Sequence, residues 1–384
     1  MTVTDLDWQP HAASLADAVA ADVPAWRDAV ASTPRHLLVP RWWNRSQDVP
    51  GGWTLSDGSA SPQEWMNAAY SDTTLVTRAG ALHADHAGEG QTGNGEPTSS
   101  STMPGLVITM LRLLDAQPGM TAVDVATGSG YSAALLSHAL GSDAVLSVDV
   151  DPYLTEAAGQ RLAALGIRPR IETVDATGPL PADGFDRLVA MVSARGIPAS
   201  WRAAVRPGGQ LVTTIANTSL MVIAEKHADG TATGHIAAEQ GHFMTVRSTP
   251  DYPDRLPEGY RHAREAEGEE VTKGRCPLPD WWNEPDLSMI FELAAPDTVV
   301  QTMEREGRRM LWLFQEDGSW ARATATGDEL PVVHQSGPRR LWAELEQAEA
   351  RWDAAGRFDL RELAAAFTPD GDVLSGPADW SVRL

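Results

Sequence analysis

The stretch VDVATGSGYSAALL, residues 123–136, decides the fold that the sequence predicts. A β-branched run ends in a glycine pair, and a run of small and apolar residues follows. The six residues GSGYSA, 128–133, fit the pattern G-x-G-x-x-G/A, in which the first glycine permits a tight turn from strand to helix. The second glycine lets a ligand approach the backbone, and the small last residue lets the helix pack on the sheet. The turn therefore predicts a site for a nucleoside-containing cofactor.

Strands and helices are predicted to alternate on both sides of this turn. Apolar runs indicate strands at residues 121–126, 144–150, 169–174, 185–193 and 210–215, and helices at 104–114, 131–140, 154–165 and 200–205. Such alternation favours an α/β fold with a doubly wound parallel sheet. The sheet pattern stops near Ile223.

The segments outside this core carry weaker signals. Apolar spacing predicts one helix over residues 12–31, and prolines frame an extended segment at 34–43. Residues 51–62 and 82–102 are rich in glycine and hydroxyl side chains, which predicts loops.

The C-terminal part has a different character. Asp317-Gly318 and Asp370-Gly371 predict the turns of two hairpins, and residues 339–356 predict an amphipathic helix. We therefore expect an added C-terminal α+β domain. The predicted organisation is an N-terminal helical segment at 1–75, a Rossmann-like core at 76–225 and a C-terminal extension at 226–384.

Composition restricts the partners. The chain has 384 residues, 52 acidic and 30 basic, with a formal net charge of −22. This charge repels a phosphate backbone, so we expect no nucleic-acid partner. No apolar run approaches the roughly 20 residues of a membrane-spanning helix, so we expect no membrane partner. Cys276 is the one cysteine, which excludes a disulfide within the chain and a cysteine-based zinc site and favours a cytoplasmic location.

Metal binding is not expected either. His83 and His86 lie three residues apart in a glycine-rich stretch, but no third ligand is apparent, and we predict no metal site.

NAD, FAD and S-adenosylmethionine (SAM) all bind turns of this kind, and several residues favour SAM. Asp124 precedes Gly128 by four residues, where its carboxylate would hold the turn or accept from the ammonium group of the cofactor. Asp149 ends the next strand about 20 residues on, where it would accept from ribose hydroxyls. Asp175-Ala176 closes a third strand and would hold the adenine amine. No second glycine turn is present for the other half of a dinucleotide.

Taken in order, several segments resemble protein-L-isoaspartate (D-aspartate) O-methyltransferases. The resemblance covers residues 28–223 and rests on AYSDTTL (69–75), SSSTMPGLV (99–107), VDVATGSGY (123–131), VDATGPLP (174–181), FDRLVAMVSARGIP (185–198) and RPGGQLV (206–212). RHLLVP (35–40) is similar to the R-x-x-F-V-P segment of that family, with Leu38 in place of phenylalanine. The resemblance implies the fold of class-I SAM-dependent methyltransferases, with SAM as cofactor and S-adenosylhomocysteine as product.

The resemblance and the residues together assign a site. The expected cofactor contacts are Ser100, Asp124, Thr127, Gly128, Ser129, Gly130, Asp149, Asp175 and Ala176. Aligned on Pro104, Thr102 stands where the family has its active-site serine. The hydroxyls of Thr102 and Ser101 are the expected catalytic groups, as donors to a substrate carboxylate.

Two departures from the family pattern indicate a specialised member. The extra methyl of Thr102 narrows the pocket, and ordinary repair enzymes lack a C-terminal extension. The combination resembles a branch associated with ribosomally synthesised and modified peptides, the lanthipeptides and graspetides. That resemblance implies a modified, macrocyclic precursor peptide as substrate, recognised by residues 226–384, whose methylated aspartate closes to an aspartimide. The alternative is general protein-L-isoaspartate repair. We expect a monomer.

Methyl transfer to a carboxylate makes few demands on the protein. An aspartate side chain has a pKa of about 3.9 and is ionised at pH 7, so no general base is required. Catalysis would rest on aligning the carboxylate with the methyl group and on excluding water. Two further hypotheses stay open: a SAM-fold protein that escorts a peptide without methyl transfer, and a nicotinamide-dependent oxidoreductase.

Overall fold

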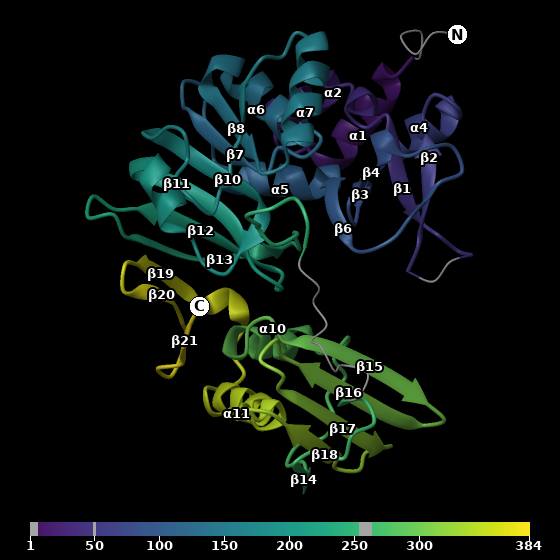
Figure 1. Cartoon of the computed structure of the whole chain (residues 1–384). Helices are drawn as coiled ribbons and strands as arrows, with labels where there is room; N and C mark the ends of the chain where they lie inside the picture. Colours follow the sequence, from purple (N-terminus) through teal and green to yellow (C-terminus); the bar gives the residue numbers. More distant parts are fainter. Residues whose placement is uncertain (1–6, 49–50, 253–262) are drawn as a thin grey trace. The chain divides into compact units, whose positions relative to one another are not determined.

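A computed structural model describes residues 7–48, 51–252 and 263–384 of the chain (Figure 1). The chain divides into two compact units, one formed by residues 1–216 and 221–252 and the other by residues 217–220 and 253–384. These bounds differ from the prediction. Residues 1–75 form no separate unit, and the second unit begins at residue 253 rather than 226, because residues 226–252 still pack with the first unit.

The first unit contains the predicted parallel sheet. Its strands follow the order β13-β12-β11-β10-β7-β8-β9. They are β7 (Ala122–Val125), β8 (Val145–Asp149), β9 (Arg170–Thr173), β10 (Phe185–Ala194), β11 (Val205–Ile215), β12 (Leu220–Lys226) and β13 (Ala232–Gln240). The strands from β11 to β9 pair in parallel, whereas β12 runs antiparallel to β11. The sheet continues past Ile223 to β13, so its predicted end is wrong. The sequence does not reveal β13, because this strand alternates buried and exposed residues and lacks the continuous apolar run of a buried strand.

The helices of this core lie close to where apolar spacing predicts them. They are α5 (Pro104–Leu114), α6 (Tyr131–Leu140), α7 (Pro152–Ala164) and α8 (Ala199–Ala204), with the short 3-10 helix η3 (Ser142–Ala144). The residues of α6 are buried from Tyr131 to Ser137 because the helix packs against both β8 and α2 (Pro24–Ser32). Asp151 caps α7 by accepting from the backbone N–H of Tyr153, which fixes the start of this helix directly after β8.

The N-terminal segment differs from its prediction in two places. The predicted helix over residues 12–31 is two helices, α1 (Gln9–Val19) and α2, because the proline at the first position of α2 cannot continue a helix. Residues 34–43, predicted as extended, contain one helical turn, α3 (Arg35–Leu38), before β1 (Arg41–Arg45). The next helix is α4 (Pro62–Ala69). Apolar residues of α1, α2 and α4 join the main core of the first unit.

A smaller sheet in the first unit contains much of the sequence that was predicted as loops. Its order is β4-β3-β1-β2-β5, with β6 paired to β3. The further strands are β2 (Trp53–Asp57), β3 (Leu75–Ala79), β4 (Leu82–His83), β5 (Thr92–Gly93) and β6 (Pro97–Ser101), with the 3-10 helix η2 (Ala84–His86). The loop predictions for 51–62 and 82–102 are therefore wrong in part. Strands this short show no apolar alternation and are stabilised by their cross-strand neighbours.

The second unit is an α+β structure, as predicted. Its antiparallel sheet has the order β14-β18-β17-β16-β15. Its elements are β14 (Glu270–Lys273), α10 (Pro285–Ala294), β15 (Val299–Arg305), β16 (Arg308–Phe314), β17 (Trp320–Thr326), β18 (Val332–Ser336), α11 (Leu341–Ala354), η4 (Leu360–Glu362), β19 (Ala364–Thr368), β20 (Gly371–Ser375) and β21 (Ser381–Arg383). Both predicted hairpins and the helix α11 are confirmed. Within the described ranges, no helix is long and apolar enough to cross a membrane.

Candidate active site

The glycine turn joins β7 to α6 at the carboxyl end of the parallel strands. Gly128 and Gly130 both have positive φ angles, of 51° and 84°. A Cβ atom on Gly128 would lie 3.2 Å from the backbone oxygen of Ser100, and one on Gly130 would lie 3.2 Å from Leu162 of α7. Both positions therefore require glycine. The close approach of α7 is a second reason for glycine at position 130, beside the predicted access of a ligand to the backbone, which stays a prediction.

Ala126, two residues before Gly128, also has a positive φ angle, of 73°. This left-handed conformation costs an L-residue about 1–2 kcal/mol. The backbone N–H groups of Ala126 and Thr127 both donate to the carbonyl oxygen of Val148, over 2.8 and 3.0 Å, and hold the turn in this shape. Strained residues of this kind cluster at functional sites. The sequence pattern does not reveal the strain.

Asp149, predicted to accept from ribose hydroxyls, holds the glycine turn. Its Oδ2 accepts from the N–H of Gly128 over 2.9 Å, and its Oδ1 accepts from the N–H of Asp151 over 3.0 Å. Burial raises the pKa of Asp149 above its ordinary value, although these hydrogen bonds and the charge of Arg247 offset part of the increase. A carboxylate oxygen accepts more than one hydrogen bond, so a ribose contact stays a prediction.

Asp124 is fully buried in β7. Its Oδ2 accepts from the hydroxyls of Ser132 on α6 and Ser147 on β8, over 2.9 and 2.8 Å. Burial raises the pKa of Asp124 to about 7. Of the two predicted roles, these contacts favour the one in which Asp124 holds the turn and its helix. Its Oδ1 is buried without a hydrogen-bond partner among the described residues, so one acceptor is left over.

Thr127 and Ser129, two predicted cofactor contacts, are buried within the turn. The Thr127 hydroxyl lies 2.7 Å from that of Ser147 and so belongs to the hydrogen-bonded cluster around Asp124. A cofactor contact from Thr127 would therefore come from its backbone.

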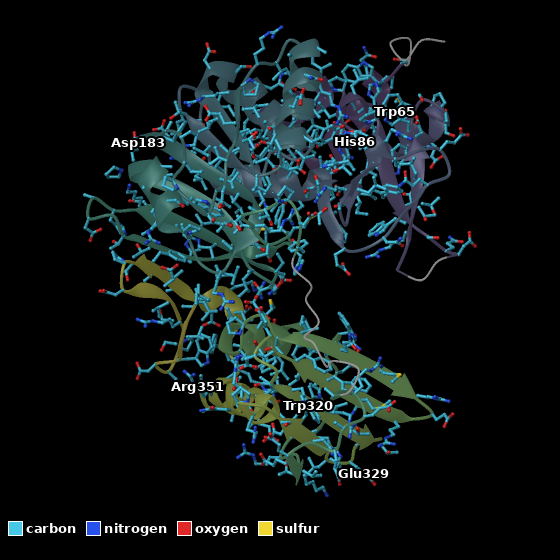
Figure 2. All side chains as sticks on the ribbon, in the orientation of Figure 1. Trp65, His86, Asp183, Trp320, Glu329 and Arg351 are labelled. Atoms are coloured by element: carbon cyan, nitrogen blue, oxygen red, sulfur yellow. The ribbon has the colours of Figure 1, made fainter. Side chains whose placement is uncertain are left out.

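Asp175 and Ala176 follow β9, where the sequence analysis expects an adenine. The Asp175 carboxylate accepts from the N–H and the hydroxyl of Thr177, over 2.8 and 2.6 Å. The carbonyl oxygen of Ala176 accepts from the Trp201 indole over 2.8 Å. An open hollow of about 720 Å³ lies next to this turn, between residues 177–183 and α8, and Figure 2 labels Asp183 in its lining.

The end of β6 brings Ser100, Ser101 and Thr102 to the glycine turn, since the backbone oxygen of Ser100 lies against Gly128. Ser101 is 1% exposed, and its hydroxyl accepts from Nε of Arg35 over 3.3 Å. This position does not favour the predicted role of Ser101 as a donor to the substrate. Thr102 is half-buried, and within the described ranges its hydroxyl forms no hydrogen bond. Thr102 is therefore the better-placed donor.

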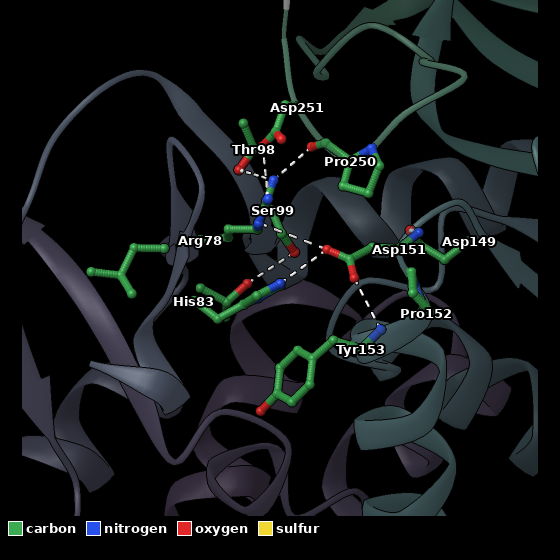
Figure 3. A network of polar contacts seen from close by, with 12 residues as sticks. Arg78, His83, Thr98, Ser99, Asp149, Asp151, Pro152, Tyr153, Pro250 and Asp251 are labelled. Atoms are coloured by element: carbon green, nitrogen blue, oxygen red, sulfur yellow. Dashed lines mark hydrogen bonds and ion pairs between the residues drawn. The ribbon is translucent and has the colours of Figure 1, made fainter. Parts of the chain in front are cut away.

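A second polar cluster, shown in Figure 3, is centred on Arg78 of β3 and was not predicted. Its guanidinium donates to the Thr98 hydroxyl of β6 over 3.1 Å. It also donates to the carbonyl oxygen of Pro250 and the carboxylate of Asp251, over 2.6 and 2.7 Å. Arg78 thus links β3 and β6, the two strands next to the site, to residues 250–251 at the end of the first unit.

His83 belongs to this cluster, and His86 packs beside it. His83 Nε2 lies 2.9 Å from the Asp151 carboxylate, and the His86 ring packs 4.1 Å from the Tyr153 ring, centroid to centroid. Burial alone would raise the pKa of Asp151, but the hydrogen bond and charge of His83 bring it below the ordinary value. Among the residues that the structure describes, no group of three His, Cys, Asp or Glu side chains could hold a metal ion.

Residues 243–252 cross the carboxyl end of β10. The N–H of Ser193 donates to the oxygen of Met244, and the N–H of Val246 donates back to the oxygen of Ser193, each over 2.8 Å. Arg247 then donates to the backbone oxygen of Thr98 in β6 over 2.7 Å. The segment therefore links β10 to the strand that precedes Thr102. The sequence analysis assigned it to the extension because no motif marks it.

Comparisons with known proteins match the first unit. The sequence model of the protein-L-isoaspartate(D-aspartate) O-methyltransferase family matches residues 62–249. A protein-L-isoaspartate O-methyltransferase of Methanothrix thermoacetophila is 32% identical over 172 residues, which are 43% of this chain and 73% of that protein. One of Aeropyrum pernix is 31% identical over 209 residues, which are 53% of this chain. The chain spans 65% of the Aeropyrum protein and 54% of a relative from Thermococcus onnurineus.

A solved structure of a protein-L-isoaspartate O-methyltransferase matches with a TM-score of 0.50 and 17% identity, over 98% of this chain and 99% of that one. At this identity the likeness shows the fold alone. This likeness in fold extends over the second unit as well. The first unit has the predicted fold of class-I SAM-dependent methyltransferases. The relative from Methanothrix and the family match show that the chain belongs to the protein-L-isoaspartate(D-aspartate) O-methyltransferase family.

Proposed function

We propose that this protein is a SAM-dependent carboxyl O-methyltransferase whose substrate is an isoaspartyl residue of a protein or peptide. The observation that carries the proposal is the Thr102 hydroxyl, which follows directly on the strand that contacts the glycine turn. A hydrogen-bond donor beside the cofactor turn is what the alignment of a carboxylate requires. Membership of the family supports the same reaction.

The residues at the strand ends fit SAM. Acceptors lie on three neighbouring strands: Asp124 in β7, whose Oδ1 has no partner among the described residues, Asp149 at the end of β8, and Asp175 after β9. In open α/β sheets, ligands bind outside the carboxyl ends of the strands. We assign the ribose to Asp149, the adenine to Asp175 and Ala176, and the methionine part to Ser100 and the backbone of residues 127–130. When bound, SAM supplies a methyl group on a sulfonium, and S-adenosylhomocysteine remains.

Thr102 has one task in this reaction. The substrate carboxylate arrives ionised, because its pKa of about 3.9 lies well below neutral pH. One carboxylate oxygen forms the new O–C bond as the C–S bond breaks, and the sulfur keeps the electron pair. The Thr102 hydroxyl donates to the other oxygen and so orients the attacking one. No proton changes place, and therefore no general base is needed.

A normal aspartate in a macrocyclic, modified precursor peptide is the second candidate substrate. The observation that favours it is the threonine at position 102, where the extra methyl restricts the carboxylates that fit. Both candidates share their next step: the following backbone nitrogen attacks the ester, methanol leaves and a five-membered imide closes. The two proposals therefore differ in the substrate and not in the chemistry.

The test compares matched peptides incubated with the full-length protein and SAM. They are a linear peptide with one isoaspartyl residue, the same peptide with normal aspartate, and a macrocyclic aspartyl peptide with its linear form. Mass spectrometry follows the gain of one methyl group and the later loss of methanol. Methylation of the linear isoaspartyl peptide alone supports the first proposal, and methylation of the macrocycle alone supports the second. Peptide binding without any methylation would overturn both in favour of an escort protein.

A further inference from the structure

A buried arginine lies next to Thr102. Arg35, the first residue of α3, is 0% exposed. Its guanidinium donates to the carbonyl oxygens of Ala69, Ser71, Thr73, Ser101 and Thr102 over 2.8–3.4 Å, and its Nε donates to the Ser101 hydroxyl over 3.3 Å. All of these partners are uncharged. Burial of a charged guanidinium among uncharged partners costs free energy of folding. A role for Arg35 at the neighbouring site would explain why it is kept there.

The Arg35 contacts begin where the sheet ends. The pairing of β3 with β6 ends at Leu75 and Ser101, so neither Thr73 nor Thr102 is part of that ladder. The Nη2 group of Arg35 donates to the carbonyl oxygens of both threonines, over 3.0 and 3.2 Å. Arg35 therefore bridges the two segments beyond the ladder, together with the N–H groups of Met103 and Gly105, which donate to the Thr74 hydroxyl and the Asp72 carboxylate over 3.0 and 2.6 Å.

Arg35 also contacts the glycine-turn side of the site. Its Cζ lies 5.4 Å from the centre of the Tyr131 ring, and Tyr131 is the first residue of α6, directly after Gly130. A guanidinium at this distance over an aromatic ring is attracted to its face. One side chain thus touches both Thr102 and the helix that follows the cofactor turn.

We infer that Arg35 is a positioning residue for methyl transfer, which fixes the Thr102 backbone relative to the glycine turn so that the threonine hydroxyl meets the substrate carboxylate in line with the methyl group. The inference rests on the proposed function. The planar fork of five N–H donors is what reaches carbonyl oxygens on two strand ends at once, and a lysine has no such fork. A misplacement of about 1 Å is enough to cost about 100-fold in rate.

Arg187 provides a matched control. It is 9% exposed, and it also donates to backbone carbonyl oxygens, those of Asp115 and Asp186, over 3.1–3.2 Å. It lies near the amino end of β10, however, whereas the glycine turn lies at the carboxyl end of the parallel strands. Arg187→Lys therefore measures the effect of losing a buried guanidinium at a position away from the candidate site.

The experiment compares Arg35→Lys, Arg187→Lys and the wild type in the full chain, with SAM and a synthetic isoaspartyl peptide. We expect Arg35→Lys to lower kcat about 100-fold, with the KM for SAM and the affinity for S-adenosylhomocysteine by calorimetry within about twofold. Arg187→Lys should keep kcat within about twofold, with a similar fall in the unfolding temperature. Equal kcat losses in the two variants, or a loss of S-adenosylhomocysteine binding that parallels kcat, would overturn the inference.

Ser101→Ala keeps the inference testable if Arg35→Lys does not fold. It removes only the hydroxyl partner of Arg35, at 3.3 Å, and leaves the five carbonyl partners in place. We therefore expect a fall in kcat of about threefold to tenfold and faster amide hydrogen exchange in residues 99–105. Wild-type kcat and exchange in this variant would count against a positioning role. A wild type that methylates neither the isoaspartyl nor the macrocyclic peptide would instead refute the proposed function, an outcome distinct from equal losses in the two arginine variants.

Discussion

The glycine turn at residues 126–130 and the strand end at residues 97–102 lie against each other, but opposite kinds of groups hold them. Around the turn, the carboxylates of Asp124 and Asp149 accept hydrogen bonds from backbone N–H groups and hydroxyls. Around the strand end, the guanidinium groups of Arg35 and Arg78 donate to carbonyl and hydroxyl oxygens, and Arg78 also donates to the carboxylate of Asp251. The side chains that hold the glycine turn are therefore acidic, whereas those that hold the strand end are basic.

This change of sign suits the reaction proposed above. A side with carboxylates favours the sulfonium, the ammonium group and the ribose hydroxyls of SAM. A side with buried guanidinium groups favours an anionic substrate. The proposed reaction transfers a methyl group from the acidic side to the basic side. The variants below change one residue of one side at a time.

The largest effect is expected on the carboxylate side. Burial raises the pKa of Asp124 from 3.8 to about 7, so the folded protein binds this proton more tightly than the unfolded chain does. The free energy of unfolding therefore falls as the pH rises between these two values, and the loss is complete above the higher one. Because one unit of pKa is worth about 1.4 kcal/mol, Asp124→Asn should gain about 4 kcal/mol relative to the wild type between pH 4 and pH 8.

Urea unfolding of both proteins at the two pH values measures this gain. Asparagine keeps an oxygen for Ser132 and Ser147, so the comparison isolates the charge. If the difference between the two proteins stays constant with pH, Asp124 is not the buried acid described here.

On the strand-end side, Thr102→Val replaces the hydroxyl with a methyl group of the same shape. The loss of a donor to the reacting carboxylate should lower kcat/KM for the preferred peptide about 100-fold, which corresponds to about 2.7 kcal/mol. Thr102→Ser restores the donor and should remain within about tenfold of the wild type. Steady-state kinetics decide the point, and full activity of Thr102→Val would remove this hydroxyl from the mechanism.

The contact between the two sides is tested by Gly128→Ala. The positive φ angle should cost about 1 kcal/mol, and the approach of the Ser100 oxygen should add about 1 kcal/mol more. Gly208→Ala is the control, because Gly208 has a φ angle of 78° and nothing within 4 Å of the added Cβ atom. Chemical denaturation measures both losses. Equal losses of unfolding free energy in the two variants would mean that the Ser100 oxygen does not crowd a side chain at position 128.

The smallest effect is expected for Ala126→Gly. Glycine relieves the left-handed strain at this position but loses more entropy on folding, so the net gain in unfolding free energy should be about 0.5 kcal/mol. Ala378→Gly, at a φ angle of 51° in the second unit, should give a similar gain. The affinity for S-adenosylhomocysteine, measured by calorimetry, should change in Ala126→Gly alone. An unchanged affinity there would show that the strain does not shape the cofactor turn.

The elements of the turn side could be predicted from sequence, whereas on the strand-end side only Ser100, Ser101 and Thr102 were predicted, and not the arginines that hold them. The pattern from 104 to 215 is periodic, and its glycine turn has a local signature, so helices, strands and the place of Asp149 follow from neighbouring residues. The motif RHLLVP marks Arg35 as part of a family segment but does not show what its side chain contacts, and no motif marks Arg78. Their partners include backbone atoms and lie up to 173 positions away, which no local pattern records.

The assignment of one donor role to both Ser101 and Thr102 has a similar origin. Side chains of a strand alternate between two faces, so recognition of β6 would have separated Ser101 from Ser100 and Thr102. The hydroxyl-rich run was predicted as a loop, and a loop offers no basis for choosing between Ser101 and Thr102 as the donor. The expected monomer and the cytoplasmic location stay predictions.

Arg35 directs nearly all of its hydrogen bonds to main-chain oxygens, which every amino acid possesses. The side chains at positions 71, 73 and 102 are therefore free to vary without loss of these bonds. Selection can act on substrate preference there while the scaffold that orients the backbone is inherited unchanged. An exchange between threonine and serine at position 102 would leave both the hydroxyl and the bond from Arg35 to the main chain in place.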